Sequence, residues 1–194
     1  MEKLNMNRMA KTIIRSSFLL MILVGFIYPF TVTGIAQVML PEKANGSLLY
    51  NENNEAIGSS LIGQSFNSPS YFQGRVSSID YDAMGSGSEN YGPSNQDMIQ
   101  RAIKSVETWN IENPDVPVEE LPVDLITNSA SGLDPHISPN AALAQVPRVI
   151  EETGIKKEML IQLINEQTES RELGLFGEPR VNVLLLNLRL DELK

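Results

Sequence analysis

The side chains best suited to acid–base or nucleophilic chemistry lie close together: Ser129, Ser131, Asp134 and His136, the only histidine of the 194 residues. A serine, a histidine and an aspartate can form a hydrolytic triad, in which the histidine takes a proton from the serine. Pro135 separates the aspartate from the histidine, and its fixed φ limits how the two side chains can converge. The sequence also has no Gly-x-Ser-x-Gly elbow. The pattern therefore favours a structural role, capping helices and binding loop amides, over hydrolysis.

Metal and phosphate chemistry have little support in the residue pattern. The chain has no cysteine, which excludes disulfides, thiol nucleophiles and cysteine-based zinc sites. Asp134 and His136 give fewer ligands than a metal site needs. The Gly-Ser-Gly-Ser run at 85–88 has the glycines of a phosphate loop but lacks the Lys-Ser/Thr ending that contacts phosphate. We predict no catalytic residue and no metal ligand, and a permissive loop over 77–95.

The elements that carry these residues begin with an uncharged stretch of 25 residues, 16–40. About 20 apolar residues of helix cross a hydrocarbon core, and this stretch reaches about 37 Å at about 1.5 Å per residue. We predict one transmembrane helix over residues 13–37, retained as an anchor. The alternative is a cleaved signal peptide, since residues 34–36 offer a small-residue cleavage pattern, although the apolar run is longer than usual.

The charges around this helix predict its orientation. Residues 1–15 contain four basic side chains and one acid, a net of +3, whereas the whole chain carries −9. Positive charge close to the first span stays in the cytoplasm. Residues 1–12 are therefore predicted to be a cytoplasmic basic tail, and residues 38–194 an extracytoplasmic domain. The acidic balance of that domain argues against binding to nucleic acid.

Small residues recur along the predicted span. Gly25, Pro29, Thr33 and Ala36 follow one another at spacings of four, four and three, and small side chains let another helix approach closely. We predict that this face packs against partners in a membrane complex; the alternative is an ordinary anchor with incidental small residues. The uncharged stretch 16–40 contains no acidic, basic or histidine residue, so it cannot carry ions by itself.

The rest of the chain predicts an α+β fold: a single N-terminal transmembrane helix followed by one extracytoplasmic mixed α/β domain. Turn signals and apolar periodicity suggest the elements. They are a hairpin pairing 47–50 with 56–62, a helix capped at 94–97, a short extended segment at 123–127, a helix from Ser138 and Pro139 to Gly154, a helix over 156–166, and a closing strand over 181–190. The middle of that strand is apolar on both faces, so we expect it to be covered on both sides.

The polar loop at 128–139 also carries a family resemblance. With Ala141, Ala142, Gln145, Val146, Arg148 and Val149, it closely resembles the signature of the C subunits of the bacterial Kdp potassium-transporting P-type ATPases. The similarity covers nearly the whole chain in order, including 28–29 and 32–37 in the span, 44–48, 61–64, 71–75 and 92–95 in the middle, and 174–188 near the end. The departures are residues 76–78 and a longer acidic connector at 110–122.

The resemblance implies a non-catalytic accessory subunit of a high-affinity, ATP-driven potassium uptake complex in the bacterial cell membrane. The implied partners are a channel-like potassium-binding subunit, a P-type ATPase pump subunit and a small membrane peptide. The family is described as an assembly factor and catalytic chaperone that raises the ATP affinity of the pump subunit. ATP and potassium ions would be handled by the complex, and no cofactor is expected to bind tightly to this chain.

The resemblance also implies site residues. The segment that holds Ser131 and Gly132, together with Gln145, is likened to an ATP-binding-cassette signature, and Gln145 would contact nucleotide. The charge pattern puts Gln145 outside the cytoplasm, where ATP is not available, so we expect an indirect, allosteric effect on ATP affinity. The rigid loop around Asp134 and His136 is expected to be a partner surface, with the helix face at Gly25. The alternatives are a membrane-anchored hydrolase using Ser131 and His136, and a cell-surface or solute-binding module.

Overall fold

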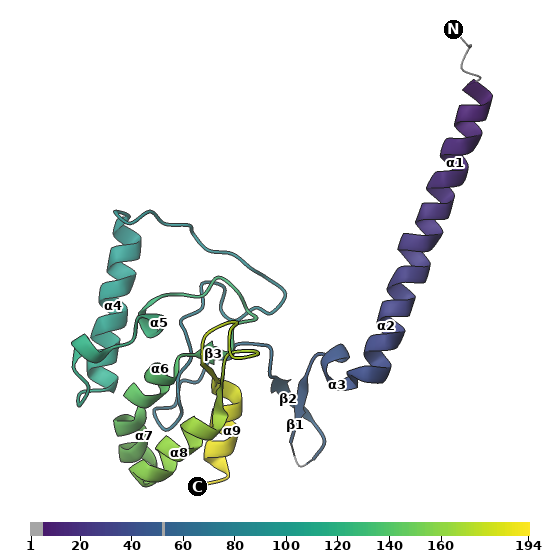
Figure 1. Ribbon diagram of the computed structural model, residues 1–194. Coiled ribbons are helices and arrows are strands. Elements are labelled where there is room, and N and C mark those ends of the chain that lie inside the picture. Colours follow the sequence, from purple (N-terminus) through teal and green to yellow (C-terminus); the bar gives the residue numbers. More distant parts are fainter. Residues whose placement is uncertain (1–5, 52) are drawn as a thin grey trace. The chain divides into compact units, whose positions relative to one another are not determined.

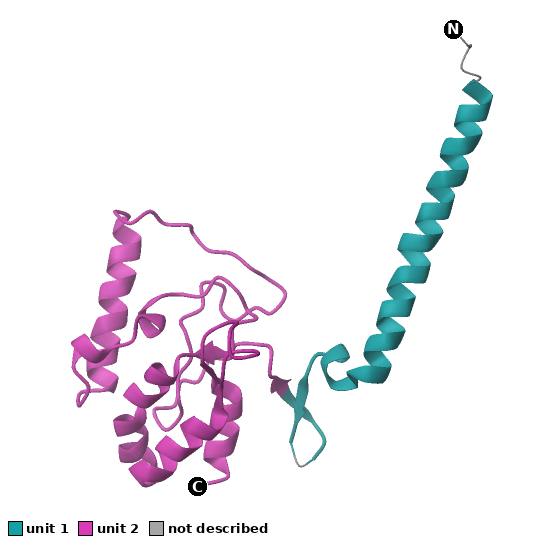
Figure 2. Cartoon of the chain, viewed as in Figure 1, with its two compact units in different colours: residues 1–57 teal, residues 58–194 magenta. Residues whose placement is uncertain are grey.

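The computed structural model describes residues 6–51 and 53–194, and the chain divides into two compact units between Ile57 and Gly58 (Figure 2). The first unit is dominated by a long helix, and the second is a mixed domain of helices and short strands (Figure 1). The predicted α+β class, with one long apolar N-terminal helix, is confirmed. The assignment of 1–12, 13–37 and 38–194 to the two sides of a membrane stays a prediction.

The long helix spans Met6–Met39, and its mean hydropathy of 2.1 makes it apolar enough to cross a membrane. It comprises α1 (Met6–Ile22), a π-helical turn η1 (Leu23–Ile27) and α2 (Tyr28–Met39). The wide turn comes just before Pro29, whose ring in a regular α-helix would clash with the carbonyl of Gly25. Tyr28 N–H instead donates to Leu23 O, five residues back. The extra residue in this turn therefore accommodates the proline.

A short helix, α3 (Pro41–Ala44), follows the long helix and leads to a two-stranded sheet of β1 (Leu48–Tyr50) and β2 (Ala56–Ser59). The Asn51 side-chain oxygen accepts hydrogen bonds from the backbone N–H groups of Asn53 and Glu55, which holds the turn closed. The predicted hairpin is confirmed.

The second unit is mainly helical. Its first long helix is α4 (Gln96–Glu112), followed by a single 3-10 turn η2 (Val118–Glu120) and a short helix α5 (Val123–Ile126). The other helices are α6 (Pro139–Ala144), α7 (Val146–Thr153), α8 (Lys157–Gln167) and α9 (Val183–Asp191). Segments without regular structure connect them over much of 60–95 and 127–135.

A three-stranded antiparallel sheet connects segments of the C-terminal half of the chain. Its strands lie in the order β3 (His136–Ile137), β5 (Arg180–Asn182) and β4 (Thr168–Glu169). Ile137 and Thr168 both pair with Val181, the buried centre of the sheet. The main core lies between this sheet and helices α6 to α9, and Phe72 from the irregular segment fills it. A smaller core surrounds Trp109, with Val116 and Leu121.

The closing strand predicted over 181–190 is wrong beyond Asn182. The strand β5 ends there, and the Asn182 side chain caps α9 by accepting a hydrogen bond from Leu185 N–H over 3.2 Å. Val183, Leu186 and Leu190 are buried at helical spacing. Apolar residues occupy most positions of this leucine-rich segment, so its pattern fits both the helical period of 3.6 and the strand period of 2. Its sequence therefore resembles a strand covered on both faces.

Three smaller boundaries also differ from the sequence-based expectation. The helix predicted from Ser138 to Gly154 is interrupted at Gln145, because Pro147 lacks the N–H that a continuous helix would need. The cap of α4 is Asn95, whose side chain accepts from two backbone N–H groups. Residues 123–126, expected as an extended segment, form one helical turn. The Ser138 cap and the left-handed Gly154 at the end of α7 are confirmed.

Candidate functional site

The loop at 128–134 is held by backbone hydrogen bonds to segments distant in sequence. Ser129 N–H donates to Val76 O over 2.7 Å, and Gly87 N–H donates to Ala130 O over 2.8 Å. Single bridges also pair Ser129 and Ser131 with residues of the 77–86 segment. The serines are therefore part of a fixed backbone scaffold. The Ser131 hydroxyl accepts a hydrogen bond from Leu133 N–H over 3.1 Å, which is a local turn contact.

Gly132 is needed for packing. A Cβ atom at this position would lie 2.1 Å from Asp82 O and 2.7 Å from the Cα of Ala83. Its own carbonyl accepts a hydrogen bond from Gly63 N–H over 2.9 Å. The glycine therefore allows two backbone segments to touch, a role that does not involve phosphate.

Asp134 is paired with Arg75 inside its own domain. The Arg75 Nη1 to Asp134 Oδ2 distance is 2.9 Å, and both side chains are mostly shielded from solvent. Arg75 is held in turn by its backbone carbonyl, which accepts a hydrogen bond from the Tyr81 hydroxyl over 3.0 Å. Burial, with a smaller contribution from Asp80, raises the pKa of that hydroxyl. Asp134 is thus a structural ion-pair partner that fixes the loop to the 75–81 segment.

His136 lies on β3, where its backbone pairs with Asn182 of β5. The imidazole is half-buried, and burial lowers its pKa below the ordinary value. Glu169 and Asp134 oppose that shift, and Arg180 adds to it. Among the residues that the structure describes, no hydrogen bond joins this imidazole to Asp134 or to Ser131, so the triad considered from the sequence is not assembled.

Gln145 is fully buried at the break between α6 and α7. Its Oε1 accepts hydrogen bonds from Gln73 N–H and from Arg148 Nη2, both over 2.7 Å. Its Nε2 donates to Gln73 O and to Ala141 O, both over 3.1 Å. An amide has two donors and two acceptor lone pairs, so the hydrogen-bonding capacity of this side chain is used within the domain.

Arg148 completes the same network, and sequence reasoning missed its role. It is only 4% exposed. Its guanidinium donates to Gln145, to Asn113 Oδ1 over 3.1 Å, and to the carbonyls of Pro69 and Tyr71. Burial lowers its pKa. The one available signal was a glutamine and an arginine three residues apart on a helix face whose other residues are apolar.

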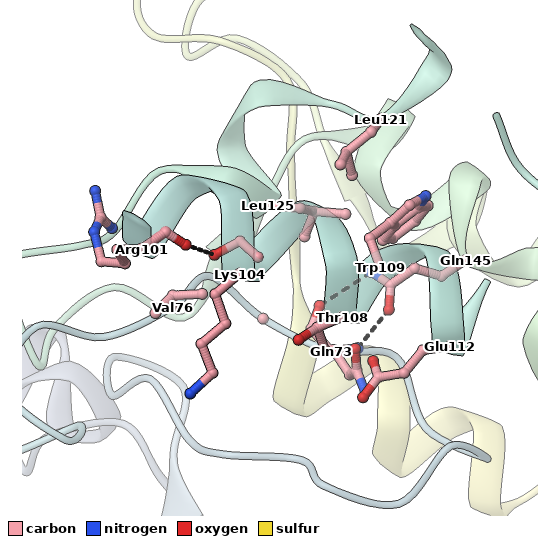
Figure 3. Close-up of a pocket in the computed structure, with 12 residues that line it drawn as sticks. Gln73, Val76, Arg101, Lys104, Thr108, Trp109, Glu112, Leu121, Leu125 and Gln145 are labelled. Carbon is pink, nitrogen blue, oxygen red and sulfur yellow. Dashed lines mark hydrogen bonds between the residues drawn. The ribbon is translucent and has the colours of Figure 1, made fainter. Parts of the chain in front are cut away.

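Gln145 also lines a pocket of about 340 Å³ between α4 and the segment that follows Phe72 (Figure 3). Trp109, Leu121 and Leu125 make its wall largely apolar, and Lys104 and Glu112 bring charges to it. Ser131 and Gly132 are not among the lining residues. The structure therefore places the three residues implied as a nucleotide site in different environments: Gln145 lies in the core, and Ser131 and Gly132 lie in the loop at 128–134.

Asp134 and His136 lie near one end of the small sheet, whereas Gly25, Pro29, Thr33 and Ala36 lie on the long helix of the other unit. No atom outside the glycine's own helix lies within 4 Å of where a Cβ would be at Gly25. Within residues 6–51 and 53–194, no group of three or more His, Cys, Asp and Glu side chains could hold a metal ion.

The architecture defines a class of protein: an apolar N-terminal helix long enough to cross a bilayer, followed by an α+β domain. A family model described as the K+-transporting ATPase, c chain, matches residues 10–192. A relative from Bacillus cereus, named potassium-transporting ATPase KdpC subunit, is 60% identical over 93% of this chain and 94% of its own length. Relatives of the same name from Bacillus anthracis and Bacillus thuringiensis subsp. konkukian are 59% identical over the same shares.

The chain therefore belongs to the KdpC family, the c chains of K+-transporting ATPases. This membership and the apolar helix associate it with a membrane and with a multi-subunit transport complex.

Proposed function

We propose that this chain is an accessory subunit that assembles and stabilises an ATP-driven potassium uptake complex. In this proposal ATP hydrolysis takes place in a P-type pump subunit. Potassium is bound by a channel-like subunit, a small membrane peptide completes the complex, and this chain binds no cofactor tightly. The observation that carries the proposal is the 60% identity to a potassium-transporting ATPase KdpC subunit along 93% of the chain.

We further propose that the chain lies with its N-terminus in the cytoplasm and residues 38–194 outside it. The net charge of +3 over residues 1–15, next to the apolar helix, supports this orientation. A reporter that is active only in the cytoplasm, fused after Lys194, should remain inactive, and a periplasm-type reporter fused there should be active. An active cytoplasmic reporter would reverse the orientation.

The chaperone effect on ATP affinity is proposed to be indirect. The Gln145 amide donates two and accepts two hydrogen bonds within the domain, so contact with a nucleotide would require breaking them. Each such bond, left unmade in a buried site, costs about 1–3 kcal/mol. An effect through the stability of the assembled state requires no such rearrangement, only different contacts with two states of the pump.

ATP titration of the complex tests this function. Complex purified with this chain should hydrolyse ATP with a lower KM for ATP than complex purified without it, and it should retain its subunits longer in detergent. Equal KM values and equal subunit retention would contradict the accessory role. Photo-crosslinking with an azido-ATP distinguishes the two routes: label on this chain would favour direct binding, and label on the pump subunit alone would favour the indirect one.

A further inference from the structure

The loop at 171–178, between β4 and β5, exposes three large apolar side chains. Leu173 is 89% exposed, Leu175 is 76% and Phe176 is 64%. Single exposed apolar residues are common on protein surfaces. Three within four residues concentrate apolar side chains at the tip of this loop, and clustered exposed apolar side chains mark interaction sites.

This loop has a defined conformation that holds the apolar side chains outward. Glu172 and Phe176 exchange two backbone hydrogen bonds of 2.9 Å each. An ion pair of 2.6 Å between Arg171 Nη2 and Glu178 Oε2 closes its base. Gly174 and Gly177 have positive φ. Leu173 also has a positive φ, of 53°, a backbone conformation that residues other than glycine rarely adopt.

The strands on either side support the loop on the core. Glu169 of β4 pairs with Arg180 of β5, and their side chains form an ion pair of 2.9 Å. The next residue of β5, Val181, is fully buried. A rigid apolar tip loses little conformational entropy on binding, which is the property of an effective anchor residue in an interface.

The charges in and around the loop limit which class of partner can bind to it. Glu172 and Glu178, beside the apolar tip, are its most exposed charged side chains. They outnumber the one cation of the loop, Arg171, which is ion-paired with Glu178. The unit 58–194 holds 20 acidic and 10 basic residues, a net of −10. An anionic lipid surface would repel this charge. A second copy of this chain would bring the same net negative charge against it.

We propose that residues 171–178, here called the apolar loop, dock into an apolar pocket with a basic rim on another subunit of the transport ATPase. This inference rests on the proposed function and adds a specific contact surface to it. Leu175 and Phe176 fill the pocket, and Glu172 and Glu178 lie against the basic rim. Truncating an anchor of this kind typically weakens binding by a factor of about 30, since anchors contribute about 2 kcal/mol or more.

The test uses the full chain, tagged after Lys194 and expressed with the other ATPase subunits. The double variant Leu175→Ser/Phe176→Ser should recover the other subunits from detergent extracts in amounts reduced by at least about tenfold. Met84→Ser is the matched control, because Met84 is 98% exposed on another loop of the same unit; it should recover the wild-type amount. Both variants should keep a thermal midpoint close to that of the wild type, because the side chains they replace are mostly exposed.

A second measurement locates the contact. A photo-reactive phenylalanine analogue in place of Leu175 should crosslink to another subunit in the purified complex, and the same probe in place of Met84 should not. Wild-type recovery by the double variant, or no crosslink from position 175, would overturn the apolar loop as a docking site while leaving the accessory function intact. Crosslinks only to a second copy, or pelleting with phosphatidylglycerol vesicles that is lost in the double variant, would also overturn it. If the wild-type chain recovered no ATPase subunit, the proposed function itself would fail, and the inference with it.

Discussion

The Oε1 atom of Gln145 accepts a hydrogen bond of 2.7 Å from Nη2 of Arg148, and both side chains are buried. The pair joins the break between α6 and α7 to the backbone at Gln73, more than 70 residues earlier in the chain. Gln145, which the family resemblance implies as a nucleotide contact, therefore connects distant segments of the chain within the domain core. The effect of changing Gln145 should first be an effect on folding.

Gln145→Leu should lower the free energy of unfolding by about 2–4 kcal/mol, because it leaves buried groups of Gln73, Ala141 and Arg148 without partners. The full chain in detergent can be unfolded with urea and followed by the fluorescence of its single tryptophan, Trp109, which is buried. Gln162→Leu on the exposed side of α8 is the control and should change stability by less than about 0.5 kcal/mol.

A direct nucleotide contact predicts a different outcome for the same variant. If Gln145 bound ATP and had no structural role, Gln145→Leu would leave the urea midpoint unchanged and raise the KM for ATP of the assembled complex. An unchanged midpoint would therefore contradict the structural interpretation.

Gly132→Ala tests whether the loop glycine serves packing. The added Cβ would lie 2.1 Å from Asp82 O, which is backbone and cannot turn aside, so we expect a loss of stability of about 1–3 kcal/mol or more. Gly92→Ala is a matched control, because nothing lies within 4 Å of its Cβ position; it should be neutral or slightly stabilising. Equal thermal midpoints for both variants would mean that the two backbone segments do not touch at Gly132.

The sequence was sufficient to predict those elements whose signals are local. The Ser138 cap with Pro139 behind it, the glycine at 154 and the long apolar helix each depend on residues close in the chain. The predicted strand over 181–190 was wrong beyond Asn182 because valines and leucines occupy most positions of the segment. Only the cap at Asn182 and the amide of Asn187, which bonds the backbone of Phe72, distinguish the helix there.

The candidate site was less predictable because its contacts are long-range. The partners of Gln145 and Arg148 include Gln73, Tyr71 and Asn113, and the tolerance of position 132 depends on Asp82. No local pattern reveals such pairings. The family resemblance identified these residues as important, and the hydrogen bonds give them a structural role.

Acidification should weaken the fold through His136. Burial holds its folded pKa below the ordinary value of 6.5, so the unfolded chain binds the proton first as the pH falls. The contribution of His136 to stability is therefore fully present above about pH 6.5. It declines as the pH falls through 6.5 toward the lower folded pKa, and the loss stops growing below that pKa.

Urea midpoints of the full chain at several values between pH 8 and pH 5 check this prediction. The wild type should lose stability over that interval, and His136→Asn should show a shallower decline. The charged neighbours Glu169, Asp134 and Arg180 also act on the pKa of the imidazole, and they are unchanged in the variant. The same slope for both proteins would assign the decline to other groups.

The helix face at Gly25 should matter for assembly rather than for folding. Gly25 lies in the π-helical turn that precedes Pro29, and there is open space where its side chain would be. A partner helix could use that space, since small residues allow close approach between membrane helices. Gly25→Leu should therefore reduce recovery of the other ATPase subunits in mild detergent severalfold, and Ala36→Leu should act in the same direction.

Val38→Leu adds bulk at a strongly exposed position of α2 outside the predicted face and should leave recovery unchanged. If all three variants recovered the wild-type amount, the small residues would be incidental, and the contacts between subunits would have to lie elsewhere.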